Sequence, residues 1–275
     1  MVKSYIPESE ELKKYIDLFY VFTREKPGDI SYIAFPHTDT AISLFENAEI
    51  IRSKGEVTIQ IPAEKKQQHA IEVVGKYTSP FFVHYKGDVK ELAIVFKPLG
   101  ISYFIEGAVS SITPGYSGPY NDTDWLSVIP SLFGEATEKL QISLLEKFLL
   151  TRLQKPDLRL MHKALEYLED LSQEYSIAQI ASLVGMNLKT FQRHVYRHLG
   201  CSPSDYRRIA RFRHSLRSGL ITTEIKKLTT LAYDSNYYDQ SYFVREYKKL
   251  TRHSPRQFFN TISLLDDRKI IWEIR

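Results

Sequence analysis

Residues 177–258 contain one short motif twice, and this duplication limits the folds open to the chain. Three pairs of identical residues lie 52 positions apart: Phe191 and Phe243, Arg193 and Arg245, Pro203 and Pro255. Apolar spacing and turn-forming residues predict that each copy is a helix, a tight turn and a second, basic helix. A repeated helix-turn-helix of this kind is typical of proteins that bind two neighbouring stretches of a DNA groove.

Local chemistry supports each part of the first copy. Ala181 is small enough for two helices to cross closely, and Gly185 adopts a positive φ in the turn at little cost. Asn187 is suited to cap the following helix, residues 188–199, by accepting a hydrogen bond from a free backbone N–H. An apolar stripe of this helix is expected to pack inward: Leu188, Phe191, Val195 and Leu199.

The opposite face of this helix has the chemistry of a major-groove surface. Arg193 can pair with guanine O6 and N7, Gln192 can pair with adenine, and Lys189 can reach guanine or phosphate. The alternative is that these side chains only solvate a helix surface. The repeat and the uneven charge of the chain favour DNA binding.

The second copy has the same organisation with different residues in its turn. Ala232 corresponds to Ala181, and Asn236 takes the place of Gly185, as the non-glycine residue that best tolerates a left-handed turn. Asp239 is suited to cap the next helix, residues 240–250. Three of its side chains are expected to face inward: Phe243, Tyr247 and Leu250. Four are expected to face the groove: Gln240, Ser241, Val244 and Arg245.

The segment Pro203–Arg217 joins the two copies and is predicted to be a helix of about 22 Å, at about 1.5 Å per residue. Such a helix would hold two recognition helices at a fixed distance, for major-groove faces about 34 Å apart. It has an apolar stripe and five arginines. Both alternatives, phosphate contacts and solvated side chains, remain open for these arginines: Arg207, Arg208, Arg211, Arg213 and Arg217.

Charge is distributed unevenly along the chain. Residues 1–157 hold 17 Lys and Arg against 21 Asp and Glu, whereas residues 158–275 hold 20 against 12. This asymmetry indicates a nucleic-acid-binding module joined to a domain with another role.

Residues 158–260 resemble the C-terminal DNA-binding domain of AraC/XylS-type transcriptional regulators. In the first half the resemblance rests on Ile180-Ala181, Gly185-Met186, Phe191-Gln192-Arg193, Gly200-Cys201-Ser202-Pro203 and Tyr206. In the second half it rests on Leu231-Ala232, Ser241-Tyr242-Phe243, Arg245, Tyr247-Lys248, Ser254-Pro255 and Phe258. The chain departs from the family pattern at Asn236 and Arg252, where the family usually has glycine.

The resemblance implies specific roles and partners. It implies base contacts from Lys189, Gln192, Arg193, Gln240, Ser241 and Val244. Further DNA contacts are expected from Arg197, Arg245, Lys248, Arg252 and Arg256. The implied partners are double-stranded promoter DNA and RNA polymerase, with activation favoured over repression.

The N-terminal half has the pattern of a β-sandwich or small barrel. Short β-branched and aromatic runs are bounded by turn residues, at Ile30–Phe45, Val57–Ile61, Ala70–Val74, Phe81–Tyr85 and Leu92–Phe96. Helices are predicted at Leu99–Glu106 and Glu135–Leu153. The leucine stripe of the second helix either packs on its own sheet or pairs with a second copy of the chain.

The predicted fold class is α+β with two domains. Residues 1–154 form a cupin-like sensor or dimerisation domain, and residues 158–260 form an all-α double helix-turn-helix. The cupin-like resemblance is architectural and rests on the strands and on Val95–Gly100 before a helix. Residues 261–275 form a tail that is either a strand docked on the first domain or a loose end.

Three hypotheses describe the N-terminal domain. It senses a small-molecule effector in a pocket lined by aromatic residues such as Trp125, it only forms a homodimer, or it is a cupin-type metalloenzyme. His37, Asp39, His69 and His84 lack the spacing of a metal site, and no catalytic or phosphate-binding motif is present. We therefore expect no cofactor and no enzymatic activity. The single Cys201 and the absence of a signal or membrane-spanning run predict a cytoplasmic protein without membrane contact.

Overall fold

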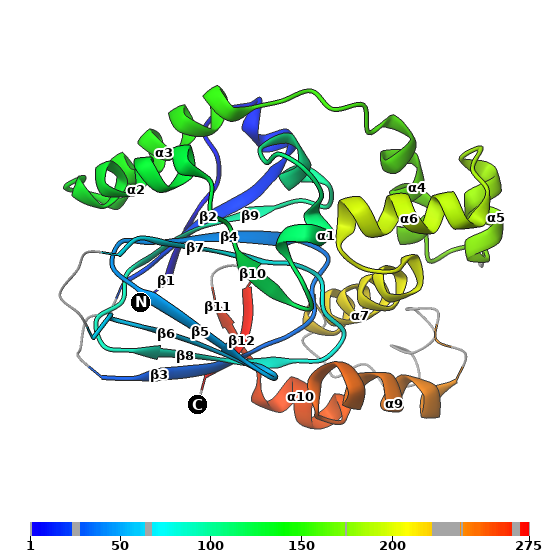
Figure 1. Cartoon of the computed structure of the whole chain (residues 1–275). Coiled ribbons are helices and arrows are strands. Elements are labelled where there is room, and N and C mark those ends of the chain that lie inside the picture. Colours follow the sequence, from blue (N-terminus) through cyan, green and yellow to red (C-terminus); the bar gives the residue numbers. More distant parts are fainter. Residues whose placement is uncertain are drawn as a thin grey trace.

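The computed structural model describes residues 2–23, 28–63, 68–173, 175–221, 237, 239–265 and 270–274. Within them, two six-stranded sheets lie face to face, and helices cover both outer faces and one end (Figure 1). The first sheet has the order β1 (Val2–Tyr5), β2 (Ile16–Phe22), β9 (Glu91–Phe96), β4 (Thr40–Phe45), β7 (Ala70–Val74) and β10 (Ser117–Pro119). The second has the order β11 (Ser263–Leu265), β12 (Ile270–Ile274), β3 (Ile30–Ala34), β8 (Phe81–Lys86), β6 (Glu56–Gln60) and β5 (Glu49–Ser53).

Side chains of the first sheet alternate between two environments, as the period of two in a strand requires. On β9, Leu92, Ile94 and Phe96 enter an apolar core on the outer face of the sheet. Glu91 and Val95 point between the sheets. The outer core is covered by the helices α2 (Thr123–Gly134) and α3 (Glu138–Arg152). The inner positions of the strands are therefore left to line a cavity.

The C-terminal half is helical. Its helices are α4 (Arg159–Glu169), α5 (Ile177–Leu183), α6 (Leu188–Leu199), α7 (Pro203–Ile221), α9 (Gln240–Thr251) and α10 (Pro255–Thr261). Short helical turns lie in the N-terminal half, at η1 (Leu12–Lys14), η2 (Gly100–Tyr103) and α1 (Val109–Ile112). Of the apolar stripe on α7, Tyr206, Ile209, Phe212 and Leu216 are buried, and Ala210 is half-buried.

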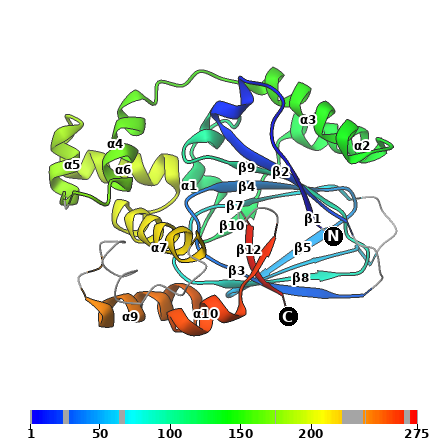
Figure 2. The ribbon, with the colours of Figure 1, turned by 180° about the vertical axis from the view of Figure 1, so that it is seen from behind.

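The sandwich and the helices share their apolar cores. Leu99 packs in the core of the first helix-turn-helix, with Phe191 and Val195. Ile33 and Phe35 pack in another helical core, together with the buried aromatic residues of α7, α9 and α10. The two halves of the chain are consequently packed against each other, and Figure 2 shows α9 and α10 beneath the sheet that contains β3.

The end of the chain returns to the sandwich. Strand β12 pairs antiparallel with β3, with Trp272 opposite Ala34 and Ile274 opposite Tyr32. Of the two alternatives left open for the tail, the structure has the docked strand. Among the described residues, no helix combines the length and apolar character needed to cross a membrane.

The expected mixed α+β fold, with a β-rich N-terminal region and a helical C-terminal region, is confirmed. Several local predictions are confirmed as well. Gly185 has φ +72°, the Asn187 side chain accepts a hydrogen bond from Thr190 N at 2.9 Å, and Asp239 accepts one from Tyr242 N at 2.6 Å. Of the leucine stripe on α3, Leu145 and Leu149 are buried in the core against the chain's own first sheet.

Other local predictions are wrong. Leu188, the first residue of α6, is 42% exposed rather than packed inward. The run Ile30–Phe45 is two strands, and Leu99–Glu106 contains only the short η2. The first helix of the second copy, which the sequence pattern predicts at residues 225–232, and the Asn236 turn lie outside the described residues.

Candidate functional site

Helix α6 presents a polar face to solvent. Its buried side is formed by Phe191, Val195 and Leu199, all 0% exposed, and the C-terminal end of the helix meets α1. Gly200 has φ +74° there, and a Cβ at this position would lie 2.9 Å from Thr113 Oγ1. The four predicted DNA-contacting residues of this helix are exposed: Lys189, Gln192, Arg193 and Arg197. The structure thus groups them on the side that the sandwich leaves free.

Helix α9 has a similar but less uniform outer face. Gln240, Ser241, Arg245 and Lys248 are exposed, whereas Val244 is half-buried. The Arg245 guanidinium lies 6.0 Å from the centre of the Tyr242 ring. On α10, Arg256 is exposed too.

Arg252 contacts the sandwich. It ends α9 with φ +66°, in the left-handed region where a glycine is usual, and its guanidinium carbon lies 5.0 Å from the centre of the Phe82 ring. A left-handed conformation costs a non-glycine residue about 1–2 kcal/mol. The stacking on Phe82 offsets part of this cost.

Three arginines of α7 make contacts within the protein. Arg207 Nη1 donates to Tyr175 O at 2.5 Å, and Arg208 lies 3.2 Å from Asp205 and 3.5 Å from Glu246. Arg213 donates to two backbone carbonyls of the N-terminal half, those of Phe35 at 3.1 Å and Pro36 at 2.6 Å. These contacts connect α7 to the segment before α5, to α9 and to the sandwich, and neither alternative considered from the sequence includes them.

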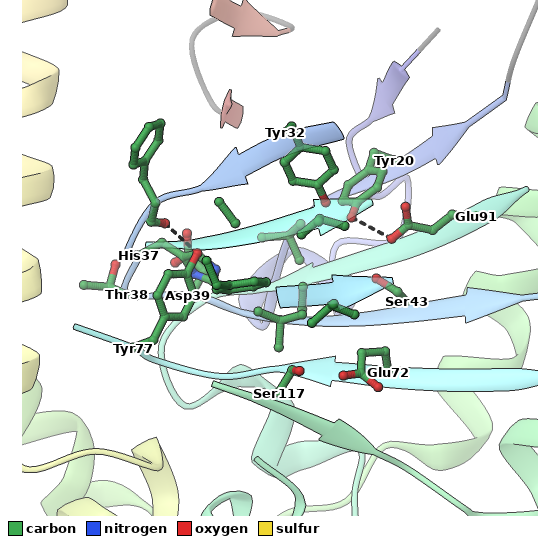
Figure 3. Close-up of a pocket in the computed structure, with 18 of the residues that line it drawn as sticks. Tyr20, Tyr32, His37, Thr38, Asp39, Ser43, Glu72, Tyr77, Glu91 and Ser117 are labelled. Atoms are coloured by element: carbon green, nitrogen blue, oxygen red, sulfur yellow. Dashed lines mark hydrogen bonds between the residues drawn. The ribbon is translucent and has the colours of Figure 1, made fainter. Parts of the chain in front are cut away.

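A cavity of about 580 Å³ lies between the two sheets and reaches α7. This volume is in the range of sites for small organic ligands, roughly 300–1,000 Å³. Apolar walls come from both sheets, at Ala34, Ala41, Val57, Ile59, Val74 and Val83. Polar side chains gather in separate places along it, with Glu91 apart from His37 and Asp39 (Figure 3).

Glu91 is 2% exposed and is held by tyrosines from both sheets. It accepts hydrogen bonds from Tyr20 Oη of β2 at 2.8 Å and from Tyr85 Oη of β8 at 2.5 Å. Burial raises the pKa of Glu91. Among the described residues, no Lys, Arg or His nitrogen lies within ion-pair distance of its carboxylate.

Glu72, the other buried glutamate of the lining, has a cationic partner. Its side chain is 5% exposed, and Arg52 Nε donates to Glu72 Oε1 at 2.9 Å while a second guanidinium nitrogen contacts Oε2. The two glutamates therefore differ in charge balance although both lie on inner strand positions.

Where the cavity meets α7, it is lined by Arg213 and Arg217 together with His37 and Asp39. Burial lowers the pKa of His37 to about 3, so this imidazole is neutral at neutral pH. Burial raises the pKa of Asp39, and the nearby Arg213 charge opposes this shift. The helix that joins the two helix-turn-helix units is thus part of the cavity wall.

Sequence reasoning missed Glu72 and Glu91. The available signal was an acidic residue at an inward position of a strand that is otherwise apolar, as in IEVV and ELAIVF. Trp125, a residue of α2, is 0% exposed in the outer core and does not line the cavity. His84 Nδ1 lies 2.7 Å from Ser31 Oγ, and the described residues contain no group of three or more His, Cys, Asp or Glu arranged to hold a metal ion.

Comparisons with known proteins locate two matching segments. Residues 180–261 match a family model described as a helix-turn-helix domain, and residues 3–116 match a domain of unknown function (DUF6597). Among curated proteins, no sequence matches this chain.

Several solved structures are similar to the chain at low identity. ToxT from Vibrio cholerae is 13% identical over 88% of this chain and 97% of that chain, with a TM-score of 0.43. Its complex with an unsaturated fatty acid is 14% identical over 87% and 93%, with a TM-score of 0.42. A transcriptional regulator with an AraC-type DNA-binding domain, from Chromobacterium violaceum, is 21% identical over 36% and 87%, with a TM-score of 0.33. These similarities concern the arrangement of the chain and give no information about its ligands or activity.

Proposed function

We propose that this chain, whose residues 180–261 form an AraC-type helix-turn-helix domain, is a sequence-specific transcriptional regulator that responds to a small-molecule effector. The observation that carries the DNA-binding role is the exposed basic face of α6, on a helix whose opposite side is buried. A similar exposed face on α9 gives the chain two DNA-contacting surfaces joined by α7.

The two surfaces are proposed to have unequal roles. On α6, Lys189, Gln192 and Arg193 contact base edges, because their side chains match the donor and acceptor patterns of guanine and adenine. On α9, Gln240 and Ser241 supply fewer base contacts. Phosphate contacts position the protein on DNA without selecting a base sequence. We assign them to Arg197, Arg245, Lys248 and Arg256. Arg252 is assigned to the contact with Phe82.

Effector response is proposed from the position of the cavity. Arg213, Leu216 and Arg217 line it, and all three belong to α7, the helix between the two DNA-contacting surfaces. A ligand that binds these residues more tightly in one position of α7 than in another would shift the populations of the two helix positions. Activation through RNA polymerase, as the family resemblance implies, and a homodimer are further parts of this proposal.

The DNA-binding part is tested with the full chain. Selection from random duplexes should yield a preferred site, and a mobility-shift titration then measures affinity for it. Arg193→Ala should weaken binding by about 1–3 kcal/mol and relax the preference at one base position. The matched control is Arg159→Ala, which removes an arginine whose side chain is 88% exposed on α4 and paired with Asp157. Equal affinity of the unaltered chain for all duplexes would refute the base-contact assignment.

The phosphate contacts have a separate signature. Lys248→Ala should weaken binding to preferred and random duplexes alike, and should reduce the slope of log affinity against log salt by about one. A change of base preference in this variant would instead assign Lys248 to base contacts.

A further inference from the structure

The cavity contains a buried carboxylate whose charge is not met by a cation of the protein. Glu91 accepts hydrogen bonds from the phenols of Tyr20 and Tyr85, one on each carboxylate oxygen, and Ser43 is a further hydrogen-bond partner; all three donors are neutral. Hydrogen bonds from phenols reduce the cost of burying a charge, but a buried charge normally has a partner of opposite sign. A positively charged group of a ligand would therefore balance this carboxylate.

The surroundings of Glu91 suit an organic cation better than a water molecule. Tyr32 and Tyr85 stack with ring centres 6.1 Å apart, and Phe22 lies 4.7 Å from Tyr85 by the same measure. Aromatic ring faces attract ammonium groups, and several rings beside a carboxylate form the usual setting for a substituted ammonium ion. The apolar walls beyond these rings offer room for a hydrocarbon body.

Four other charged groups of the lining have oppositely polarised partners. Arg213 donates to two backbone carbonyls, Lys97 Nζ donates to Lys13 O at 2.5 Å, and Glu72 is paired with Arg52. Asp39 is attracted by the Arg213 charge. An anionic ligand would have to compete with these oxygen acceptors for Arg213, so the charge balance favours a cationic ligand at Glu91.

Ser117 is an independent sign that the cavity is built for a ligand. This residue is 5% exposed and lines the cavity, and its hydroxyl is buried without a hydrogen-bond partner among the described residues. Buried hydroxyl groups in native proteins are nearly always hydrogen-bonded. Figure 3 shows Ser117 beside Glu72, away from Glu91, where it would meet a second polar group of the ligand.

We propose that the cavity binds an organic amine, with its ammonium group at Glu91 among Tyr20, Tyr32 and Tyr85 and its apolar body between the two sheets. The inference deepens the proposed function, because it names the chemical class of the effector and depends on the cavity being an effector site. It commits to a protonated or quaternary amine and excludes a simple carboxylic acid.

Three probes of equal chain length test the charge preference: octyltrimethylammonium, octanoate and 1-octanol. Binding to the full chain is measured by calorimetric titration and by the shift in melting temperature. The ammonium probe should bind and raise the melting temperature, and the other two should bind at least about tenfold more weakly. Preferential binding of octanoate would overturn the proposal, and so would the absence of ammonium binding.

Variants locate the site. Glu91→Gln should weaken ammonium binding by about tenfold or more, since a charge-assisted contact is worth at least the 1.4 kcal/mol of a tenfold change. The matched control is Asp39→Asn, which neutralises another carboxylate of the same cavity beside α7. Tyr32→Leu removes a ring while the carboxylate remains, and should also weaken ammonium binding if Glu91→Gln fails to fold. Equal loss in the control, or no loss in either Glu91 or Tyr32 variant, would refute the placement.

DNA affinity measured with and without the ammonium probe separates this inference from the proposed function. A carboxylate probe that binds and changes DNA affinity would preserve effector response while refuting the amine. An ammonium probe that binds through Glu91 without changing DNA affinity would support the ligand class and refute effector response.

Discussion

Phe35 links the sandwich to α9 and α10, and its removal should loosen these two helices selectively. The side chain follows β3, is 1% exposed and meets the Phe258 ring edge-on with centres 4.8 Å apart. Truncation of a buried Phe to Ala typically costs about 3–5 kcal/mol. Because the cavity left by Phe35→Ala would lie in the core shared with α9 and α10, most of this cost should fall on the docking of those helices.

Hydrogen exchange of backbone amides in the full chain measures the effect locally. At 1.4 kcal/mol for each factor of ten, amides in α9 and α10 should exchange about 100- to 3,000-fold faster, while those of β9 change much less. The matched control is Phe45→Ala, which removes a Phe that is 2% exposed between the two sheets. This control should accelerate exchange in the strands first.

The reasoning would be refuted if Phe35→Ala accelerated exchange in β9 as much as in α9 and α10. It would also be refuted if both helices kept their protection. Either result would mean that the shared core does not attach α9 and α10 to the sandwich.

Three further predictions concern the buried Glu91, the strained Arg252 and the pairing of the C-terminal strands with β3. Burial raises the pKa of Glu91 above its ordinary value of 4.5, so the native state keeps this proton to a higher pH than the unfolded chain. Glu91 therefore contributes its full stability below pH 4.5 and loses it as the pH rises. At pH 7–8, Glu91→Gln should melt at a higher temperature than the unaltered chain. The difference between the two melting temperatures should vanish near pH 4.5. A difference that grows on acidification would contradict this. Arg252→Gly should be about 1 kcal/mol more stable than Arg252→Ala in denaturant unfolding, because only glycine relieves the strain at φ +66°; equal stability of the two variants would argue against strain. Deletion of residues 263–275 should remove the β12 neighbour of β3, which would keep only its pairing with β8, and should accelerate exchange of the β3 amides near Tyr32 and Ala34. Unchanged protection of these amides would show that the tail contributes no stabilising pairing.

The helix-turn-helix part was predictable because its signals are local. Asn187 and Asp239 cap helices through backbone groups three residues away, and Gly185 serves a turn of a few residues. These interactions close within one turn of chain, so the sequence pattern alone indicates them. The inward positions Phe191 and Val195 follow from helical periodicity for the same reason.

The contacts of the α7 arginines could not be predicted from the neighbouring sequence. Arg213 looks like any basic residue on a helix, yet it donates to carbonyls at positions 35 and 36, almost 180 residues earlier in the chain. Arg208 likewise meets Glu246 of another helix. Nothing in the neighbouring sequence distinguishes these arginines from exposed ones, because their partners are brought near only by the packing of the two halves.

The sequence by itself determined the first helix-turn-helix, the basic second helix of the other copy, the charge asymmetry and the β-rich character of the N-terminal half. Only the tertiary structure decided that a cavity lies between the two sheets, that Glu91 faces tyrosines from both of them, and that α7 forms part of its wall. The physical reason is the separation along the chain of the residues that interact. Caps, turns and periodicity act between residues close in the chain, whereas a cavity and its charge balance arise from strands whose register and packing join residues far apart in sequence.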